Sequence, residues 1–137
     1  MALTAVLEFG DNDIKRYSKR YLVSDCRFVF TLDYNDFRPS SVPRCEKVEV
    51  AVVAPGKESP VLYEWHDSRG VYSGRIVLSR ASNSRPEEVD DHILYFENAQ
   101  CFSLREDYDI DNNRRRTLVL GIDAESFNID GEIFKHL

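Results

Sequence analysis

Alternation of apolar and polar residues along nearly the whole chain is the feature that most limits what it can fold into. Successive side chains of an extended strand point to opposite faces, so a period of two predicts strands with one buried face. The stretches "ALTAVLEF", "YLVSDCRFVFTLDY", "KVEVAVVA", "VYSGRIVLSR", "HILYFENAQCFSL" and "RRTLVLGIDAESFNID" follow this pattern. The residues predicted to face the core are Leu3, Ala5, Leu7, Phe9, Leu22, Cys26, Phe28, Phe30, Leu32, Val48, Val50, Val52, Ile76, Leu78, Leu118, Leu120, Ile122 and Ala124.

One segment, "SPVLYEWHDSRG", breaks the alternation and predicts a short helix. Ser59 is a suitable N-cap, Pro60 fits the first helical position, and Gly70 follows the expected end. We expect Trp65 to fill the gap between this helix and the sheet. No linker or repeat divides the 137 residues, so a single domain over 1–137 is expected. The residues alone predict a mainly β fold, an antiparallel barrel or sandwich with one inserted helix.

The charge balance argues against nucleic acid and membranes as partners. The chain carries 24 acidic and 18 basic residues, a formal net charge of −6, so it lacks the positive charge that phosphate binding requires. No apolar run approaches the ~20 residues of a membrane-spanning helix. The opening stretch "MALTAVLEFGDND" lacks the basic start of a signal peptide, so we expect synthesis and folding in the cytoplasm.

An acidic turn near the end of the chain has part of the pattern of a calcium-binding loop. Asp107, Asp109 and Asp111 have the required spacing, but the positions that need glycine and glutamate hold Asn112 and Leu118. The sequence therefore favours a solvated acidic turn over a calcium site.

Histidine, cysteine and carboxylate residues suggest no catalytic group. The histidines are not at metal-ligand spacing, and the odd number of cysteines contains no CxxC pair. Glu97 is an isolated strand carboxylate that could face the barrel interior, with no acid or base partner in the sequence. The residues considered are His66, His92, His136, Cys26, Cys45 and Cys101. We expect no enzyme activity, no metal and no cofactor.

A series of short motifs in a fixed order resembles a known family. The stretches "RPSSVPRCEKVEVAVVAP", "LYEW", "YSGRIVL", "ILYFENAQCFSLREDYDI" and "TLVLGIDAESFNID" are similar to the Hcp (TssD) tube proteins of type VI secretion systems, especially the Bacteroidetes-type branch. The resemblance covers about residues 2–130. Its motifs are Arg38-Pro39-Ser40-Ser41, Tyr63-Glu64-Trp65 and Phe96-Glu97-Asn98-Ala99. One departure is Pro43-Arg44-Cys45, where glycines often follow in the family.

The resemblance implies an antiparallel β-barrel with one short helix at its side and an extended loop. It also implies a structural protein whose copies form hexameric rings, which stack into the inner tube of the secretion system and carry effectors. The implied partners are further copies of the chain and the sheath, baseplate or spike, and effector proteins. The implied location is the cytoplasm, followed by export through the type VI system.

The proline-containing segment before the strand at residues 47–54 is the predicted contact between subunits. Pro39 and Pro43 restrict the backbone, so the segment loses less entropy when it docks. Arg38 and Arg44 can bind carboxylates of a neighbour through two hydrogen bonds each. The predicted interface residues are Phe37, Arg38, Pro39, Ser40, Ser41 and Arg44. An ordinary exposed hairpin loop is the alternative.

The stretch "REDYDIDNNRRR" places an acidic block next to a basic block and is the predicted contact between stacked rings. The predicted stacking residues are Asp107, Asp109, Asp111, Arg114, Arg115 and Arg116. The alternative is a hairpin tip whose charges neutralise one another. For the whole chain, the alternative function is a soluble β-barrel that binds a small molecule or a peptide.

Overall fold

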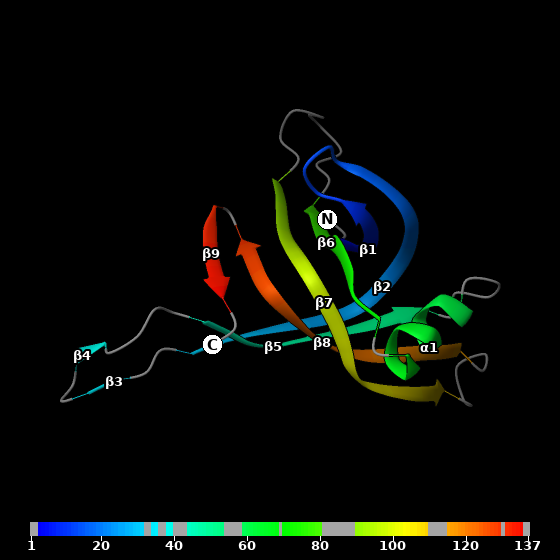
Figure 1. The fold of residues 1–137 in the computed structure, drawn as a ribbon. Coiled ribbons are helices and arrows are strands. Elements are labelled where there is room, and N and C mark those ends of the chain that lie inside the picture. The colour runs from blue at the N-terminus through cyan, green and yellow to red at the C-terminus, as the bar shows by residue number, and fades with distance from the viewer. Residues whose placement is uncertain are drawn as a thin grey trace.

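Strands form almost all of the regular structure of the chain. The computed structural model describes residues 3–31, 34–35, 38–39, 44–53, 59–68, 70–80, 90–109, 115–129 and 131–135. Within these ranges the elements are β1 (Leu3–Asp11), β2 (Arg16–Thr31), β3 (Tyr34–Asn35), β4 (Arg38–Pro39), β5 (Arg44–Val53), α1 (Ser59–Asp67), β6 (Tyr72–Arg80), β7 (Asp90–Asp109), β8 (Arg115–Ile129) and β9 (Glu132–Lys135) (Figure 1).

Six of these strands close into an antiparallel barrel. The order β5-β2-β1-β6-β7-β8 returns to its start because β5 also pairs with β8, from Val48 opposite Ile122 to Val53 opposite Thr117. Strand β9 lies beside the upper half of β8, with Ser126 opposite Lys135. The closed order decides for a barrel over a sandwich and confirms the fold class that the resemblance implied.

The predicted core faces are confirmed on most strands. Alternate residues of β1, β5, β6 and β8 point into the barrel, and a buried aliphatic side chain of this kind contributes about 1.5–3 kcal/mol of hydrophobic free energy. Leu78 is only partly buried but packs against the core. The confirmed buried residues are Ala5, Leu7, Phe9, Val48, Val50, Val52, Ile76, Leu118, Leu120, Ile122 and Ala124. The side chains of Leu3 and Leu32 lie outside the described part of the chain.

The predicted face of β2 is wrong at both of its ends. Leu22 and Phe30 are 59% and 43% exposed, whereas Tyr21 and Val23 are buried. The pairing of β2 with β5 is interrupted by irregularities after Val23 and after Val29. The first irregularity skips Ser24 of β2 and moves the following side chains of β2 to the other face. The second skips Glu46 of β5 and leaves the alternation of β2 unchanged, so Phe30 is exposed because it lies beyond the stretch where β5 pairs with β8. Only the middle of the predicted face, Cys26 and Phe28, packs against the core.

The predicted helix forms and packs against β7. It covers Ser59–Asp67, and Leu62 and Trp65 on its inner face are fully buried. The indole Nε1 of Trp65 donates a hydrogen bond of 2.9 Å to the carbonyl oxygen of Ala99, which confirms that Trp65 fills the gap between helix and sheet. No helix in the described ranges is long and apolar enough to cross a membrane.

Strand β7 bends sharply where it meets α1, as Figure 1 shows. Asn98 has a left-handed backbone with φ of 52°, and the pairing with β6 shifts register between Tyr72 and Gly74. The inward-facing positions therefore change from Phe96 to Ala99. The side chain of Asn98 donates a hydrogen bond of 2.7 Å to Glu125 of β8. This bend carries the second half of β7 beneath the helix.

Candidate assembly surfaces

An arm projects from one side of the barrel. Because β5 pairs with β8 only from Val48 onwards, its first residues pair with β2 alone, from Arg44 opposite Thr31. The strands β3 and β4 continue this arm, with Tyr34 opposite Pro39 and Asn35 opposite Arg38. In Figure 1 the β3–β4 hairpin lies far from the barrel, on the side away from α1. A ribbon of two strands is only marginally stable in water on its own.

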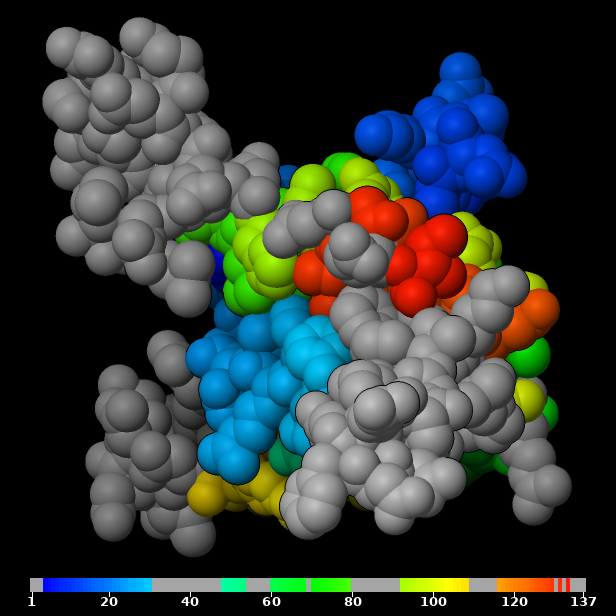
Figure 2. Space-filling view, turned by 90° about the vertical axis from the view of Figure 1, so that its left-hand side faces the viewer, coloured from blue at the N-terminus to red at the C-terminus, as the bar shows by residue number. Residues whose placement is uncertain are grey.

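The base of the arm exposes apolar side chains. Val29 and Phe30 follow one another on β2 and are 42% and 43% exposed. Strands β2 and β9 form much of the described surface on this side of the molecule, where Figure 2 shows them in light blue and red. The arm therefore combines a weakly supported backbone with apolar groups in contact with water.

The predicted interface residues fall on this arm, and half of them are described. The backbones of Arg38 and Pro39 form β4, and Arg44 begins β5, so short strands replace part of the expected loop. Phe37, Ser40 and Ser41 lie outside the described residues.

The predicted stacking residues lie at the opposite end, where β7 and β8 form a hairpin. The acidic strand pairs directly with the basic strand, because Asp109 lies opposite Arg115 and Tyr108 opposite Arg116. Asp107 also belongs to this end and is exposed. Asp111 and Arg114 lie outside the described residues, as do the side chains of Asp109 and Arg115.

Part of the acidic block is already bound within the chain. The guanidinium of Arg105 donates two hydrogen bonds of 3.0 Å to the carboxylate of Asp107 and thereby lowers the pKa of Asp107. Glu106 accepts hydrogen bonds from the hydroxyls of Tyr63 and Tyr108. Asp107 thus presents a paired charge to the surface, although its partner Arg105 lies outside the basic block of the hairpin.

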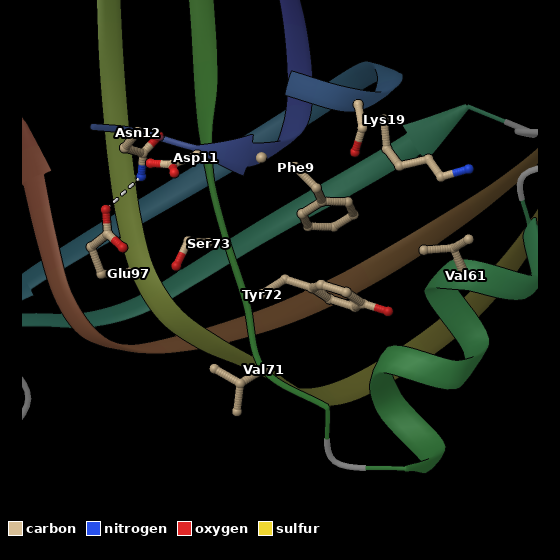
Figure 3. A pocket seen from close by; sticks show the side chains of 11 residues that line it. Phe9, Asp11, Asn12, Lys19, Val61, Val71, Tyr72, Ser73 and Glu97 are labelled. Atoms are coloured by element: carbon tan, nitrogen blue, oxygen red, sulfur yellow. Dashed lines mark hydrogen bonds between the residues drawn. The ribbon is translucent and has the colours of Figure 1, made fainter. Parts of the chain in front are cut away.

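A third surface feature is a pocket of about 570 Å³ beside α1. Figure 3 shows the rings of Phe9 and Tyr72 at its centre, whose centroids are 5.1 Å apart. Its lining residues are Phe9, Gly10, Asp11, Asn12, Ser18, Lys19, Val61, Val71, Tyr72, Ser73 and Glu97. Glu97 borders this pocket while its neighbour Phe96 is buried, so the expectation that Glu97 faces the barrel interior is wrong. Strand alternation turns one of two adjacent side chains outward.

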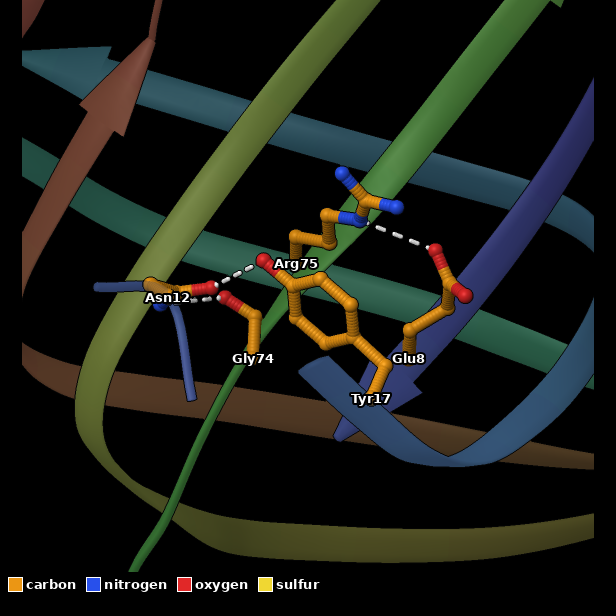
Figure 4. Close-up of polar contacts among 5 residues, drawn as sticks. All are labelled: Glu8, Asn12, Tyr17, Gly74 and Arg75. Atoms are coloured by element: carbon orange, nitrogen blue, oxygen red, sulfur yellow. Dashed lines mark hydrogen bonds and ion pairs between the residues drawn. The ribbon is translucent and has the colours of Figure 1, made fainter. Parts of the chain in front are cut away.

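The pocket is held in shape by Asn12, in the turn between β1 and β2. Its Nδ2 donates hydrogen bonds to the carbonyl oxygens of Gly74 (2.9 Å) and Phe96 (3.1 Å). The same amide donates to Oε1 of Glu97 at 2.9 Å. Its Oδ1 accepts a hydrogen bond of 2.7 Å from the hydroxyl of Tyr17, as Figure 4 shows. One side chain therefore ties the turn to β6 and β7.

Tyr17 connects this network to an ion pair on the barrel wall. Its ring covers the guanidinium of Arg75, with 4.2 Å from the guanidinium carbon to the ring centroid. The Nε of Arg75 lies 2.9 Å from Oε1 of Glu8 on the neighbouring strand (Figure 4). Burial is the main cause that raises the pKa of Tyr17, so its hydroxyl stays protonated and available to Asn12 at neutral pH.

Sequence reasoning missed this network. The turn itself has a signal, because Asn and Asp in "GDNDIK" are typical turn residues. The partners of Asn12 lie up to 85 residues away in the chain, and local spacing carries no information about them.

Side chains that could perform catalysis are dispersed. Within the described residues, no group of three His, Cys, Asp or Glu side chains could hold a metal ion. His66 Nδ1 lies 3.1 Å from the carbonyl oxygen of Cys101, and His92 lies on β7. Cys101 is buried, and burial raises the pKa of its thiol to about 11, so it is a poor nucleophile at neutral pH. His136 and the side chain of Cys45 lie outside the described part.

Comparison with known proteins gives one family and a set of similar folds. The family model for hemolysin coregulated protein Hcp (TssD) matches residues 1–136. Similar solved structures include Hcp1 from Flavobacterium johnsoniae, at 17% identity over 99% of this chain and 100% of that chain, with a TM-score of 0.67. Secreted Hcp3 from Pseudomonas aeruginosa is 11% identical over 93% of this chain and 90% of that chain, with a TM-score of 0.64.

A third similar structure comes from another assembly. The anti-feeding prophage baseplate, solved with 6-fold symmetry, is 9% identical over 96% of this chain and 95% of that chain, with a TM-score of 0.55. A search of curated proteins found no match. At these identities the solved structures bear on the fold alone.

Proposed function

The chain belongs to the Hcp (TssD) family of type VI secretion tube proteins, and on that premise we propose that six copies close into a ring. The rings stack into an inner tube that carries effector proteins. The 6-fold symmetry of the prophage baseplate, which shares the fold, supports this number of copies. The function is structural, without a catalytic step.

The observation that carries the proposal is the presence of two unlike surfaces on opposite sides of one barrel. The β3–β4 arm lies on one side and α1 on the other (Figure 1). A closed ring needs such a heterologous contact, in which one patch of a subunit meets a different patch of the next. The exposed Val29 and Phe30 at the base of the arm supply apolar area for that contact.

The proposed contact between subunits is the arm, through Phe37, Arg38, Pro39, Ser40, Ser41 and Arg44. Its prolines reduce the entropy lost on docking, and its arginines pair with carboxylates of the neighbour. Replacing Phe37 and Arg38 with aspartate should leave a folded monomer.

The proposed contact between rings is the β7–β8 hairpin, through Asp107, Asp109, Asp111, Arg114, Arg115 and Arg116. Single exposed ion pairs contribute about 0–1 kcal/mol, but sixfold repetition makes weak contacts effective together. Because exposed charges are screened within about 10 Å at 0.1 M salt, stacking should weaken as salt is added.

The further partners in this proposal are the sheath, the baseplate or spike, and the carried effectors. The chain folds in the cytoplasm and leaves the cell through the type VI system. The alternative, a soluble β-barrel that binds a small molecule or a peptide, would be favoured by an enlarged pocket inside the barrel. The interior is instead filled by side chains such as Leu7, Val50 and Phe96.

Native mass spectrometry combined with negative-stain imaging of the purified chain tests the proposal. We expect a six-copy species and ring-shaped particles. A chain that stays monomeric at every concentration, with no rings on the grid, would contradict it.

A further inference from the structure

We propose that the pocket beside α1 is the acceptor site for the arm of a second copy. In this contact Phe37 of the incoming arm lies against the apolar half of the pocket, and Arg38 lies at its acidic half. The inference rests on the proposed function, because it takes the arm to be a contact between subunits.

The apolar half of the pocket offers an open surface for an aromatic ring. Phe9 and Tyr72 form its floor, and Val61 of α1 and Val71 form its sides (Figure 3). Val71 is 50% exposed, although it lies directly beside the buried core. An aromatic side chain placed here would gain contacts with two rings and cover Val71.

The acidic half offers two carboxylates, Asp11 and Glu97, against one cation in the same lining, Lys19, and within the described residues neither carboxylate forms an ion pair. Glu97 is half-buried and accepts its hydrogen bond from the neutral amide of Asn12, and it forms no ion pair within the described residues. Asp11 accepts a hydrogen bond from the backbone N–H of Asp13, which is likewise neutral. A partly desolvated carboxylate is stabilised by an opposite charge nearby, so this half of the pocket favours a guanidinium.

The arm has the matching chemistry. Its sequence places an aromatic residue next to a cation, Phe37-Arg38, and Arg38 lies in the β3–β4 hairpin at the outer end of the arm. The arm and α1 lie on opposite sides of the barrel (Figure 1), so a molecule cannot fill its own pocket. The contact is therefore head to tail between copies.

The pocket is formed before anything binds to it. The hydrogen bonds of Asn12 fix the acidic side, and Trp65 packs edge-on against Phe9 and Tyr72 at 4.9 and 5.7 Å between ring centroids. A preformed site loses little entropy when it is occupied. Trp65 is the only tryptophan in the chain, so its fluorescence reports on the floor of this pocket.

The first test uses the chain diluted to monomer and a synthetic peptide of residues 34–44, YNDFRPSSVPR. We expect saturable binding, followed by the change in Trp65 fluorescence. Replacing Asp11→Asn and Glu97→Gln together keeps both side-chain shapes and should weaken binding about tenfold. Asp13→Asn, on the same turn but outside the pocket lining, is the matched control and should change nothing.

The second test places cysteines at both ends of the proposed contact. We expect a short bis-maleimide to link the double variant Arg38→Cys, Val71→Cys into covalent multimers. Each single variant alone, which retains the natural cysteines, is the control and should give only background.

The outcomes separate this inference from the proposed function. Rings that form normally while the double variant fails to cross-link overturn the acceptor site and leave the tube proposal standing. A wild-type chain that never forms rings contradicts the tube proposal, and peptide binding to the monomer then decides the acceptor site alone. No peptide binding, or binding that Asp11→Asn and Glu97→Gln do not weaken, overturns it.

Discussion

The barrel next to α1 and the base of the β2–β5 arm are two parts of one β-sheet. The first buries its apolar side chains, and the second exposes them to water. Beside the helix, Trp65 is fully buried, its N–H is bonded to Ala99, and aromatic rings surround it. On the arm, Val29 and Phe30 are exposed, and among the described strands β2 and β5 pair only with each other. Folding of one chain completes the first region and leaves the second incomplete. Stability and assembly should therefore respond to different substitutions.

The largest expected effect is on the completed region, through Trp65→Ala. Loss of a fully buried aromatic side chain and its hydrogen bond should lower the free energy of unfolding by about 3–5 kcal/mol. Urea unfolding followed by circular dichroism measures this change. Trp65→Phe is the control and should cost less, because most of the buried area remains. A loss below about 1 kcal/mol would remove the contrast between the two regions.

The second largest expected effect is also on the stability of the completed region, through the hydrogen bonds of Asn12 at its polar edge. Asn12→Ala leaves the carbonyl oxygens of Gly74 and Phe96 without their donor and should cost about 1–3 kcal/mol. Asp13→Ala changes an exposed residue of the same turn and should stay within about 0.5 kcal/mol. Equal unfolding midpoints for the two variants would show that the turn is not anchored through Asn12.

On the arm, Val29→Lys should affect assembly rather than the stability of the monomer. A polar residue at an exposed strand position should change the unfolding free energy by less than about 1 kcal/mol. Ring formation, measured by native mass spectrometry, should be lost because the apolar contact now carries a charge. Rings that persist in Val29→Lys, or a monomer that unfolds, would break the comparison.

The smallest effect concerns the β7–β8 hairpin, which resembles the arm in its exposure. Arg105→Gln should leave the unfolding midpoint at neutral pH unchanged, because both side chains of its ion pair with Asp107 are exposed to solvent. The hydrogen bonds from Arg105 lower the pKa of Asp107 from its ordinary value in the folded chain, because they stabilise the carboxylate. Any contribution of the pair is present above the ordinary pKa of Asp107 and lost as pH falls through the lowered folded pKa, and at this exposed position it is too small to move the midpoint.

Nuclear magnetic resonance titration of Asp107 checks this prediction directly. The pKa of Asp107 should rise toward its ordinary value in Arg105→Gln. A pKa of Asp107 that stays low in this variant would mean that a group other than Arg105 stabilises the ionised carboxylate.

Much of the fold could be predicted from alternation and local turn signals. Faces with an unbroken period of two, such as Val48 to Val52, are correct because a single register sets every side chain. Leu22 is wrong because the irregularity after Val23 changes the phase of β2, and no residue type there announces it. The helix is correct because its start and end carry local signals.

The surfaces were less predictable than the core. The register of β7 and β8 brings the acidic and basic blocks together, as their positions on a hairpin indicated. The pocket beside α1 depends on residues from five separated segments, which only the closed barrel brings together. Glu97 was singled out, but which of the adjacent Phe96 and Glu97 faces inward is set by the register of β7 against β6, which local spacing does not give.

The pairing of β5 with β8 has a consequence for how copies tell one another apart. Over Val48–Val52, β2 pairs with one edge of β5 and β8 pairs with the other, so the backbone of this stretch offers a neighbour no free edge. Along this stretch, recognition between copies then depends on side chains, which can vary without disturbing the closed ladder. Two chains sharing this barrel could evolve into separate, non-mixing tubes through a few surface exchanges.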